Sequence, residues 1–589
     1  MSLTESPLSC VLIGSDSLLI QCGEILLQKG HAIRGVASRE RAILDWAQSK
    51  QLPTFPSGRQ ITSHLRGMEL DYLFSITNLS IIPEEALEIP RKAAINFHDG
   101  PLPRYAGMYA PAWALLHGET EYGISFHEMA GGIDEGDLQI QRRFPIGPQE
   151  TSLTLNTRCF ENAIEAFGEL VDGLAAGGIR PTPQDLSERT YFGRHERPAG
   201  AGVCDWERPA SEVERCVRAL DFGHYENAFA AAKIVHQGRV CLPGSAEVSD
   251  PAEGGEPGRL LEIDAEGWRV ACGESTSIRL RDLRSPTGEP LSPDEAARRL
   301  GIRAGERLIG LGAAERARLD ELVRATTPAE GFWVRRLAQL DSPEIPLLRS
   351  DRGPETEGGI RSVEIEIPER FRSVCPEAPA TALIAAFAGY LARVNGRSEF
   401  DLTLSDARFG EQLEGLGELY SREVPLRIDL DLAGDVGAAI DSVERALDET
   451  RKRGGFLNDV VRRYPQLQQD EGLASGRLAS VGVALTSDLD GHVPRVGTDC
   501  SLVVDPSGQR ARLVHDLRAL SPEAASQLAH HLRVFLAGAS DPARPLARVP
   551  MLDDEGRRRV LEDWNRTDVD FDRSQTIHAL FEAQAARTP

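Results

Sequence analysis

The residues best suited to chemistry stand in one short stretch, Asn96-Phe97-His98, which is followed by Gly100-Pro101-Leu102-Pro103. Residues two apart on a β-strand share a face, so the Asn96 amide and the His98 imidazole are predicted to enter one pocket, with Phe97 turned to the core. The Gly-Pro-Leu-Pro run then turns the chain out of the sheet. Open α/β sheets bind ligands at the carboxyl ends of their parallel strands, which is where this loop begins.

A second candidate is the acidic loop from Gly131 to Asp137, which is flanked by glycines. We expect Asp134 in this loop to approach His98 and to fix the tautomer of its imidazole. The predicted catalytic set, Asn96, His98 and Asp134, suits acyl transfer to an amine. His98 accepts the proton that the amine loses, Asn96 donates to the oxyanion, and Asp134 orients the ring.

Each of these pieces also has a plainer interpretation. A lone histidine on a strand is more often a packed or surface residue, and the loop from Gly131 to Asp137 is by itself only a polar turn. The loop lacks the ligand spacing of a calcium site, and no metal site is predicted. The catalytic interpretation depends on the three residues occurring together and in this order.

The surrounding pattern predicts the elements that position these residues. Short apolar strands at 10–14, 32–37, 72–76 and 94–97, with a helix at 18–28, predict a doubly wound α/β fold with a parallel sheet. The first turn, from Gly14 to Ser17, is not a GxGxxG motif, so a dinucleotide-binding dehydrogenase is weakly supported.

The sequence pattern changes twice in the later part of the chain. After a long helix at 155–176 and a break at Pro181, a helix at 211–220 and short alternating runs over 231–309 predict a small β-barrel. Beyond 313, a charged helix, an alternating strand and an apolar helix at 381–394 predict a further α/β unit. The predicted domains are 1–187, 188–312, 313–555 and 556–589, and we expect the last segment to lead into a larger polypeptide.

Composition excludes some classes of function. The chain has 589 residues and a formal net charge of −24, which argues against general nucleic-acid binding. No apolar run is long enough for a membrane span, and no secretory signal is visible. The nine cysteines form no CxxC pair. We therefore expect a cytoplasmic protein with reduced thiols and without nucleic-acid or membrane partners.

Together, the Asn-x-His strand, the Leu-Pro-x-Tyr-x-Gly loop and the acidic loop resemble the 10-formyltetrahydrofolate-dependent formyltransferases, a family that includes the methionyl-tRNA formyltransferases. The resemblance runs over about 10–183 and extends through Val203-Cys204-Asp205-Trp206 to about 309. It implies 10-formyltetrahydrofolate as the formyl donor. The folate-binding residues that it implies are Phe74, Ser75, Ile76, Leu79, Met129, Ala130, Gly131, Gly132 and Ile133.

One departure from this family follows the histidine. Many relatives have Ser-Leu-Leu-Pro there, whereas this chain has Asp99-Gly100-Pro101-Leu102-Pro103. We expect this change to affect the position of the acceptor more than the use of folate.

Residues after 313 resemble the second half of a condensation domain of nonribosomal peptide synthetases. Phe332-Trp333, the helix at 381–394 and the stretch 416–427 follow that family's order, but its HHxxxDG motif is absent. The pair His530-His531 lies in a predicted amphipathic helix and is not expected to be catalytic. The segment from Trp564 onward resembles the lead-in to an adenylation domain.

This second resemblance implies partners and an acceptor. Downstream adenylation and peptidyl-carrier domains would present an aminoacyl-phosphopantetheine, and its formylation would initiate a nonribosomal peptide. Alternatives are a formyltransferase acting on a sugar, tRNA or small-molecule amine, a formyl-folate hydrolase, and a non-catalytic scaffold.

Overall fold

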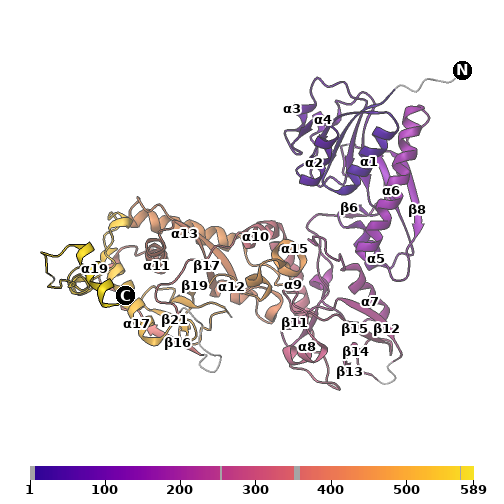
Figure 1. Ribbon diagram of the computed structural model, residues 1–589. Coiled ribbons are helices and arrows are strands. Elements are labelled where there is room, and N and C mark those ends of the chain that lie inside the picture. The colour runs from indigo at the N-terminus through magenta and orange to yellow at the C-terminus, as the bar shows by residue number, and fades with distance from the viewer. Residues whose placement is uncertain are drawn as a thin grey trace. The chain divides into compact units, whose positions relative to one another are not determined.

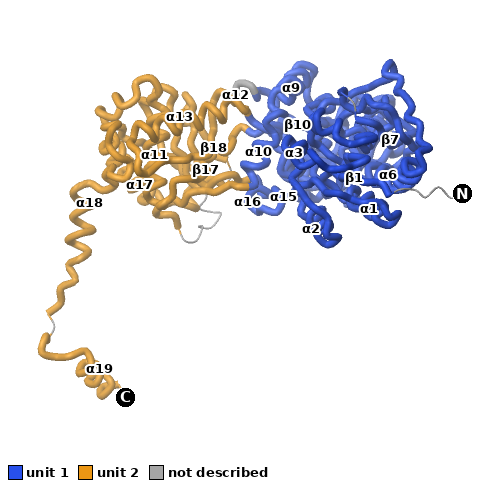
Figure 2. Tube along the Cα trace, turned by 90° about the horizontal axis from the view of Figure 1, so that it is seen from above, with its two compact units in different colours: residues 1–338, 413–421, 455–476 blue, residues 339–412, 422–454, 477–589 orange. Residues whose placement is uncertain are grey.

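The computed structural model describes residues 7–129, 131–251, 255–349, 359–495, 497–570 and 572–588. The chain divides into two compact units (Figure 2). Unit 1 comprises residues 1–338, 413–421 and 455–476, and unit 2 comprises residues 339–412, 422–454 and 477–589.

Unit 1 begins with a seven-stranded sheet in the order β3-β2-β1-β4-β5-β7-β8. Neighbours from β3 to β5 pair in parallel, and β7 and β8 pair antiparallel, so the predicted parallel sheet is confirmed. The predicted strand at 94–97 is one residue longer at each end, which makes His98 its last residue. The strands are β1 (Ser9–Gly14), β2 (Ala32–Ala37), β3 (Thr54–Phe55), β4 (Tyr72–Ile76), β5 (Ala93–His98), β7 (Glu121–Glu128) and β8 (Leu138–Pro145).

Helices cover both faces of this sheet, as a doubly wound fold requires. Alternate residues of β1 explain why: Cys10 and Leu12 pack in one apolar cluster, whereas Val11 and Ile13 pack in another. The first cluster includes α1 and α6, which lie side by side (Figure 1), and the second includes α3 and α4. The helices are α1 (Ser17–Gln28), α2 (Arg41–Ser49), α3 (Ile61–Leu65), α4 (Glu84–Leu87), α5 (Ala110–His117) and α6 (Ser152–Ala175).

The second part of unit 1 contains a four-stranded antiparallel sheet in the region where the sequence predicts a small β-barrel. Its strand order is β12-β15-β14-β13, and among the described residues β12 and β13 do not pair with each other. Closure of these strands into a barrel stays a prediction. Helix α7 (Ala210–Ala219) packs against β12 and β15, and α8 (Pro293–Leu300) packs against β13. The strands are β12 (Ser245–Ser249), β13 (Leu260–Asp264), β14 (Gly267–Ala271) and β15 (Ser277–Arg281), with the separate hairpin β10 (Ile234–His236) and β11 (Arg239–Cys241).

Buried ion pairs join this sheet region to a much later segment of unit 1. Lys233 Nζ lies 2.6 Å from Asp459 Oδ2, and Arg463 Nη2 lies 2.6 Å from Glu330 Oε2. The side chains of Lys233, Asp459 and Arg463 are each only 1% exposed. Lys233 Nζ also donates to the carbonyls of Ala201 and Ala231. Every charge in this cluster is thus paired, which is the condition under which charges tolerate burial.

The cluster explains which later residues belong to unit 1. Helices α9 (Ala313–Thr326) and α10 (Glu330–Leu337) and the segments 413–421 and 455–476 fold with it. The boundary predicted at 312 stays a prediction, but the physical unit extends past it.

Unit 2 contains a six-stranded mixed sheet in the order β16-β21-β20-β19-β17-β18. Helix α11 (Pro379–Asn395), predicted at 381–394, is almost wholly buried. His530 and His531 lie on α17 (Pro522–Gly538), where His530 Nε2 is 3.0 Å from Asp553 Oδ2 and both side chains are partly exposed. The other main elements are β16 (Ile360–Glu364), β17 (Glu399–Asp406), β18 (Glu423–Asp429), β19 (Val481–Leu485), β20 (Cys500–Val504), β21 (Ala511–Asp516) and α13 (Val436–Arg453).

The final helices, α18 (Asp554–Arg558) and α19 (Ile577–Arg587), contain no buried residue. Within the described part of the chain, no helix combines the length and apolarity needed to cross a membrane.

The buried ion cluster predicts a large stability effect at Asp459. Replacing Asp459 with Ala leaves Lys233 buried without its carboxylate, so the free energy of unfolding should fall by about 3–5 kcal/mol. Urea denaturation of the whole chain, followed by a signal from unit 1, measures this. The control is Glu207→Ala, which removes an exposed partner of Arg307 in the same unit. Equal stabilities of the Asp459 and Glu207 variants would contradict the role given to the cluster.

Candidate active site

The end of β5 presents the predicted pair at the carboxyl edge of the parallel strands. Asn96 and His98 share one face of β5, and His98 is 5% exposed. Phe97 points the other way, with its ring 5.4 Å from that of Phe126 in the core. The predicted sharing of a face by Asn96 and His98, with Phe97 turned to the core, is confirmed, whereas their entry into one pocket stays a prediction.

A backbone carbonyl sets the tautomer of His98. His98 Nε2 lies 2.7 Å from the carbonyl oxygen of Tyr105. A carbonyl oxygen only accepts, so Nε2 carries hydrogen, and Nδ1 of the neutral ring carries the lone pair. Asp134 Oδ2 is 3.7 Å from Nδ1, beyond hydrogen-bond distance. The structure therefore gives the tautomer-fixing role to Tyr105 rather than to Asp134, because the loop after β5 folds back over the ring.

The loop that carries Tyr105 is anchored at several points. Leu102 N donates to Ser125 Oγ, which in turn donates to the Gly100 carbonyl. Gly107 must be glycine, because its φ is +98° and an added Cβ would lie 2.1 Å from the Phe192 carbonyl oxygen. This backbone conformation places the Gly107 N–H at 2.9 Å from Asp134 Oδ2.

Asp134 is a nearly buried carboxylate held among hydrogen-bond donors and imidazoles. Its side chain is 11% exposed, and its backbone has a left-handed φ of +57°. Burial alone would raise the pKa of Asp134, but His98, then His127 and the Gly107 amide, outweigh it and hold that pKa well below its usual value. Asp134 is therefore ionised and positioned to stabilise His98 when the ring takes a proton.

His127 is a member of the site that the sequence did not reveal. It is 2% exposed, and its Nε2 lies 3.2 Å from Asn96 Nδ2 and 3.4 Å from Asp134 Oδ1. Its Nδ1 lies 2.8 Å from the Glu128 carbonyl, which fixes hydrogen on that nitrogen. Nε2 lies between the Asn96 amide and Asp134 Oδ1 and so holds both side chains in place. The only signal for His127 is the register that sets it directly opposite Asn96 on β7.

A second carboxyl group stands beside the ring. Asp99 Oδ1 lies 3.9 Å from His98 Nδ1, and the Asp99 side chain is about one-third exposed. Burial raises the pKa of Asp99, opposed by His98 and assisted by the charge of Asp134. Asp99, which stands where many relatives have serine, thus places an additional carboxyl group on the Nδ1 side of His98.

The residues predicted to bind folate fall into two groups. Phe74, Ser75 and Ile76 of β4 are fully buried, and the Phe74 ring packs edge-on against Phe167. By contrast, Leu79 is 62% exposed and Ile133 is 51% exposed.

Of the remaining predicted residues, Met129 donates its backbone N–H to the Ala94 carbonyl. Gly131 has open space around its Cα, whereas a Cβ on Gly132 would meet the Glu135 carboxylate. Ala130 lies outside the described residues. A folate-binding role for all nine stays a prediction.

The arrangement defines a class of site. A histidine with a free Nδ1, an oriented amide and a charged carboxylate meet at the carboxyl edge of a doubly wound sheet, which suits acyl transfer. Among the described residues, no group of three or more histidine, cysteine or acidic side chains is placed to hold a metal ion.

Comparison with known proteins defines the family. Residues 36–171 match the formyl transferase family, and residues 200–301 match the formyl transferase C-terminal domain. Over 251 residues, 43% of this chain and 76% of the relative, the sequence is 32% identical to methionyl-tRNA formyltransferase from Geobacter sulfurreducens. The chain belongs to the formyl transferase family.

Two solved structures are similar at lower identity. The N-formyltransferase from Helicobacter canadensis, in complex with folinic acid and dTDP-3-aminofucose, is 16% identical; the match covers 47% of this chain and 99% of that one, with a TM-score of 0.39. HypX from Aquifex aeolicus, in complex with tetrahydrofolic acid, is 19% identical; the match covers 51% of this chain and 49% of that one, with a TM-score of 0.38. Both of these proteins bind folate derivatives.

The opposite pKa shifts of Asp134 and Asp99 predict opposite pH dependences. The folded-state pKa of Asp134 is lowered, so its stabilising contribution is present above the unfolded value of about 4 and is lost as the pH falls below it. Relative to wild type, Asp134→Asn should lose on the order of 1.5–3 kcal/mol at pH 7, and this loss should shrink progressively as the pH falls below about 4 toward the lowered folded-state pKa. Chemical denaturation across this pH range measures the difference.

Asp99→Asn is the matched control. The pKa of Asp99 is raised, so its contribution to stability is present below the unfolded value and is lost as the pH rises. Relative to wild type, Asp99→Asn should therefore gain stability as the pH rises above about 4. Parallel pH trends for the two variants would show that the charges are assigned wrongly.

Proposed function

We propose that unit 1 transfers a formyl group from 10-formyltetrahydrofolate to an amine. The observation that carries this proposal is the free Nδ1 of His98 beside the charged Asp134 and the oriented Asn96. Membership of the formyl transferase family and the folate complexes of its relatives support the choice of donor.

The side chains divide the reaction between them. Asn96 donates to the oxyanion that forms when the amine nitrogen bonds to the formyl carbon. His98 Nδ1 takes the proton that this nitrogen loses. The same imidazolium then returns the proton to the folate nitrogen as its bond to the formyl carbon breaks, so the products are a formamide and tetrahydrofolate.

The remaining groups keep His98 ready for both steps. The Tyr105 carbonyl holds the hydrogen on Nε2, and Asp134 balances the charge of the protonated ring. Asp134 remains ionised throughout, because its own pKa is held low. His127 keeps the Asn96 amide aligned through the 3.2 Å contact between their nitrogens.

For the donor, we propose that the pterin lies against the exposed apolar side chains of Leu79 and Ile133. Exposed apolar groups beside a polar site are typical of an apolar slot that a flat ring fills. Met129, Gly131 and Gly132 would supply backbone groups on the same side, and the buried residues 74–76 would support the slot from beneath.

For the acceptor, we propose the amino group of an aminoacyl-phosphopantetheine on a downstream carrier domain. Support comes from the resemblance of residues 313–555 to part of a condensation domain and of the last residues to an adenylation lead-in. On this proposal the chain acts in the cytoplasm, with adenylation and carrier domains as partners, and begins a nonribosomal peptide.

A sugar amine is the second candidate acceptor. The Helicobacter canadensis relative is a complex with dTDP-3-aminofucose, and its fold is of the same kind. A sugar acceptor gives no role to residues 339–589, whereas a carrier-bound acceptor gives them the role of linking unit 1 to its substrate.

The catalytic assignments predict losses of rate. His98→Ala should lower formyl transfer by roughly 10²–10⁴-fold, because it removes the proton acceptor. Asn96→Ala should lower kcat by roughly 10²–10³-fold, because it removes the oxyanion donor. Release of tetrahydrofolate together with the formylated amine measures both rates.

His64→Ala is the control, since this exposed histidine lies on α3 and should leave the rate unchanged. A His98→Ala variant with the wild-type rate would remove the mechanism, and an effect of Asn96→Ala on KM alone would remove its role in the transition state.

A further inference from the structure

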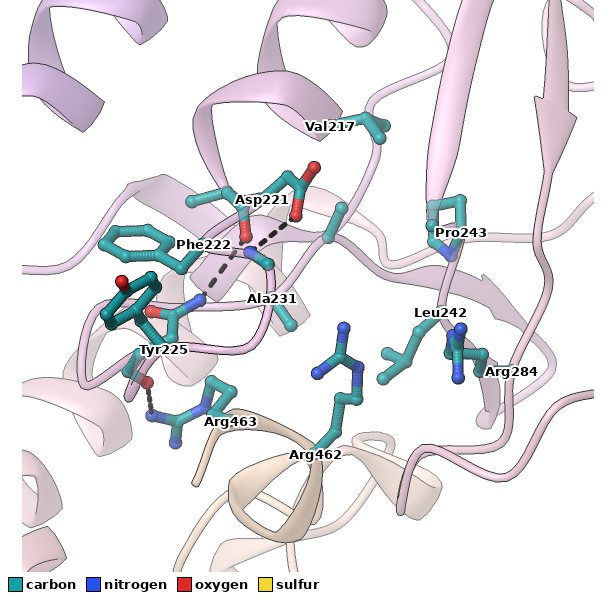
Figure 3. A pocket seen from close by; sticks show the side chains of 15 residues that line it. Val217, Asp221, Phe222, Tyr225, Ala231, Leu242, Pro243, Arg284, Arg462 and Arg463 are labelled. Carbon is teal, nitrogen blue, oxygen red and sulfur yellow. Dashed lines mark hydrogen bonds between the residues drawn. The ribbon is translucent and has the colours of Figure 1, made fainter. Parts of the chain in front are cut away.

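A pocket opens within unit 1, outside the site described above. It lies between the end of α7, the loop at 221–232, the turn at 242–244 and helix α14 (Val460–Arg463) (Figure 3). Its cavity volume is about 50 Å³, and it is open to solvent at the mouth. All of its lining residues belong to unit 1. Formyl transfer, as proposed above, does not use any of them.

Three arginines line this pocket, and only one of them has its charge balanced by carboxylate partners. Arg463 is paired with Asp459 and Glu330 in the buried ion cluster. Arg284 donates to the Gly288 carbonyl at 3.2 Å. Within the described residues, the guanidinium of Arg462 makes no hydrogen bond or ion pair. Figure 3 shows it pointing into the space between Ala231 and Leu242, with Arg284 beside Leu242.

The electrostatic surroundings leave positive charge uncompensated. Burial, and after it the like charge of Arg284, lower the pKa of Arg462, while Asp221 raises it. Asp221 Oδ1 accepts from the Gly223 N–H at 2.9 Å, and Asp221 forms no ion pair with either arginine. Two half-buried guanidinium groups thus face one space in a chain whose net charge is −24. An anion between them would relieve their repulsion.

The walls of the pocket are fixed before any ligand arrives. The Asn227 side chain donates to the Ala230 carbonyl at 2.6 Å and accepts from the Phe229 N–H at 2.9 Å. The Asn227 N–H donates to the Arg463 carbonyl at 2.8 Å.

The stem of Arg462 lies against Gly288, where an added Cβ would be 2.9 Å from the Arg462 Cδ. Gly288 also has a φ of +100°, a conformation that favours glycine. A site held in this way loses little entropy when it binds.

We propose that this pocket binds a phosphate ester, with the guanidinium groups of Arg284 and Arg462 as its ligands. Guanidinium forks match the geometry of phosphate oxygens and can bind them bidentately. Leu220, Phe222 and Tyr225 offer an apolar wall for the organic part of the ester. A phosphopantetheine arm and free phosphate share this chemistry, and the two are separated by experiment.

The test is calorimetric titration of the full chain, without folate or amine, so that its outcome is independent of formyl transfer. The probes are inorganic phosphate, 4′-phosphopantetheine and pantetheine. Both phosphate-bearing probes should bind, and pantetheine, which lacks the phosphate, should not. Tighter binding of phosphopantetheine than of inorganic phosphate assigns the site to the ester, as proposed. Equal binding of the two would overturn the ester in favour of free phosphate.

Variants locate the site. Arg462→Gln and Arg284→Gln should each weaken binding about 10-fold to 100-fold, the equivalent of a lost charged hydrogen bond. Arg462→Lys keeps the charge and should retain part of the affinity. Arg298→Gln, an exposed arginine of α8 outside the pocket, should bind like wild type. Undiminished phosphopantetheine binding by folded Arg462→Gln and Arg284→Gln, or equal binding of pantetheine, would overturn the proposal.

Discussion

The site depends on keeping one carboxylate, Asp134, charged in a place that is almost closed to water. Desolvation opposes the charge, and three neighbours offset it: the imidazoles of His98 and His127 and the N–H of Gly107. Each neighbour is supplied by a different part of the chain, namely β5, β7 and the loop between β5 and α5. The sheet register and the shape of that loop are therefore constraints on chemistry as well as on folding.

The same constraint explains the order of the groups around His98. Tyr105 holds one ring nitrogen and leaves the other facing the two aspartates, so the ring has one defined direction for proton exchange. The pKa of Asp134 is lowered, whereas that of Asp99 is raised by burial. Burial and neighbouring charge thus shift the pKa values of two similar carboxyl groups in opposite directions.

Sequence alone predicted the parts of the site that depend on local spacing. Asn96 and His98 share a face because they are two apart on a strand, and Asp134 stands in a conspicuous loop. His127 was missed because its role comes from the antiparallel pairing of β7 with β5, which spacing along the chain does not encode. The carbonyl of Tyr105 was missed because a backbone carbonyl carries no residue-type signal. The barrel stays a prediction for a related reason, since alternating residues indicate strands but not whether their edges close.

The extent of unit 1 was also beyond local reasoning. Lys233 and Asp459 are separated by more than two hundred residues, yet each supplies the buried counter-charge of the other. Cutting the chain near 312 would leave Lys233 without its carboxylate and would remove Arg462 from the pocket. Experiments on the isolated formyltransferase region should therefore keep residues 313–338, 413–421 and 455–476.

The most direct test of the central claim is a mass balance for the whole chain supplied with 10-formyltetrahydrofolate and candidate amines, including an aminoacyl-phosphopantetheine. Mass spectrometry of the amine and quantification of tetrahydrofolate give the two sides of the balance. Formyl transfer predicts one formylated amine for each tetrahydrofolate released and little release when no amine is present. Tetrahydrofolate released at the same rate without an amine, or no turnover with any amine, would contradict it.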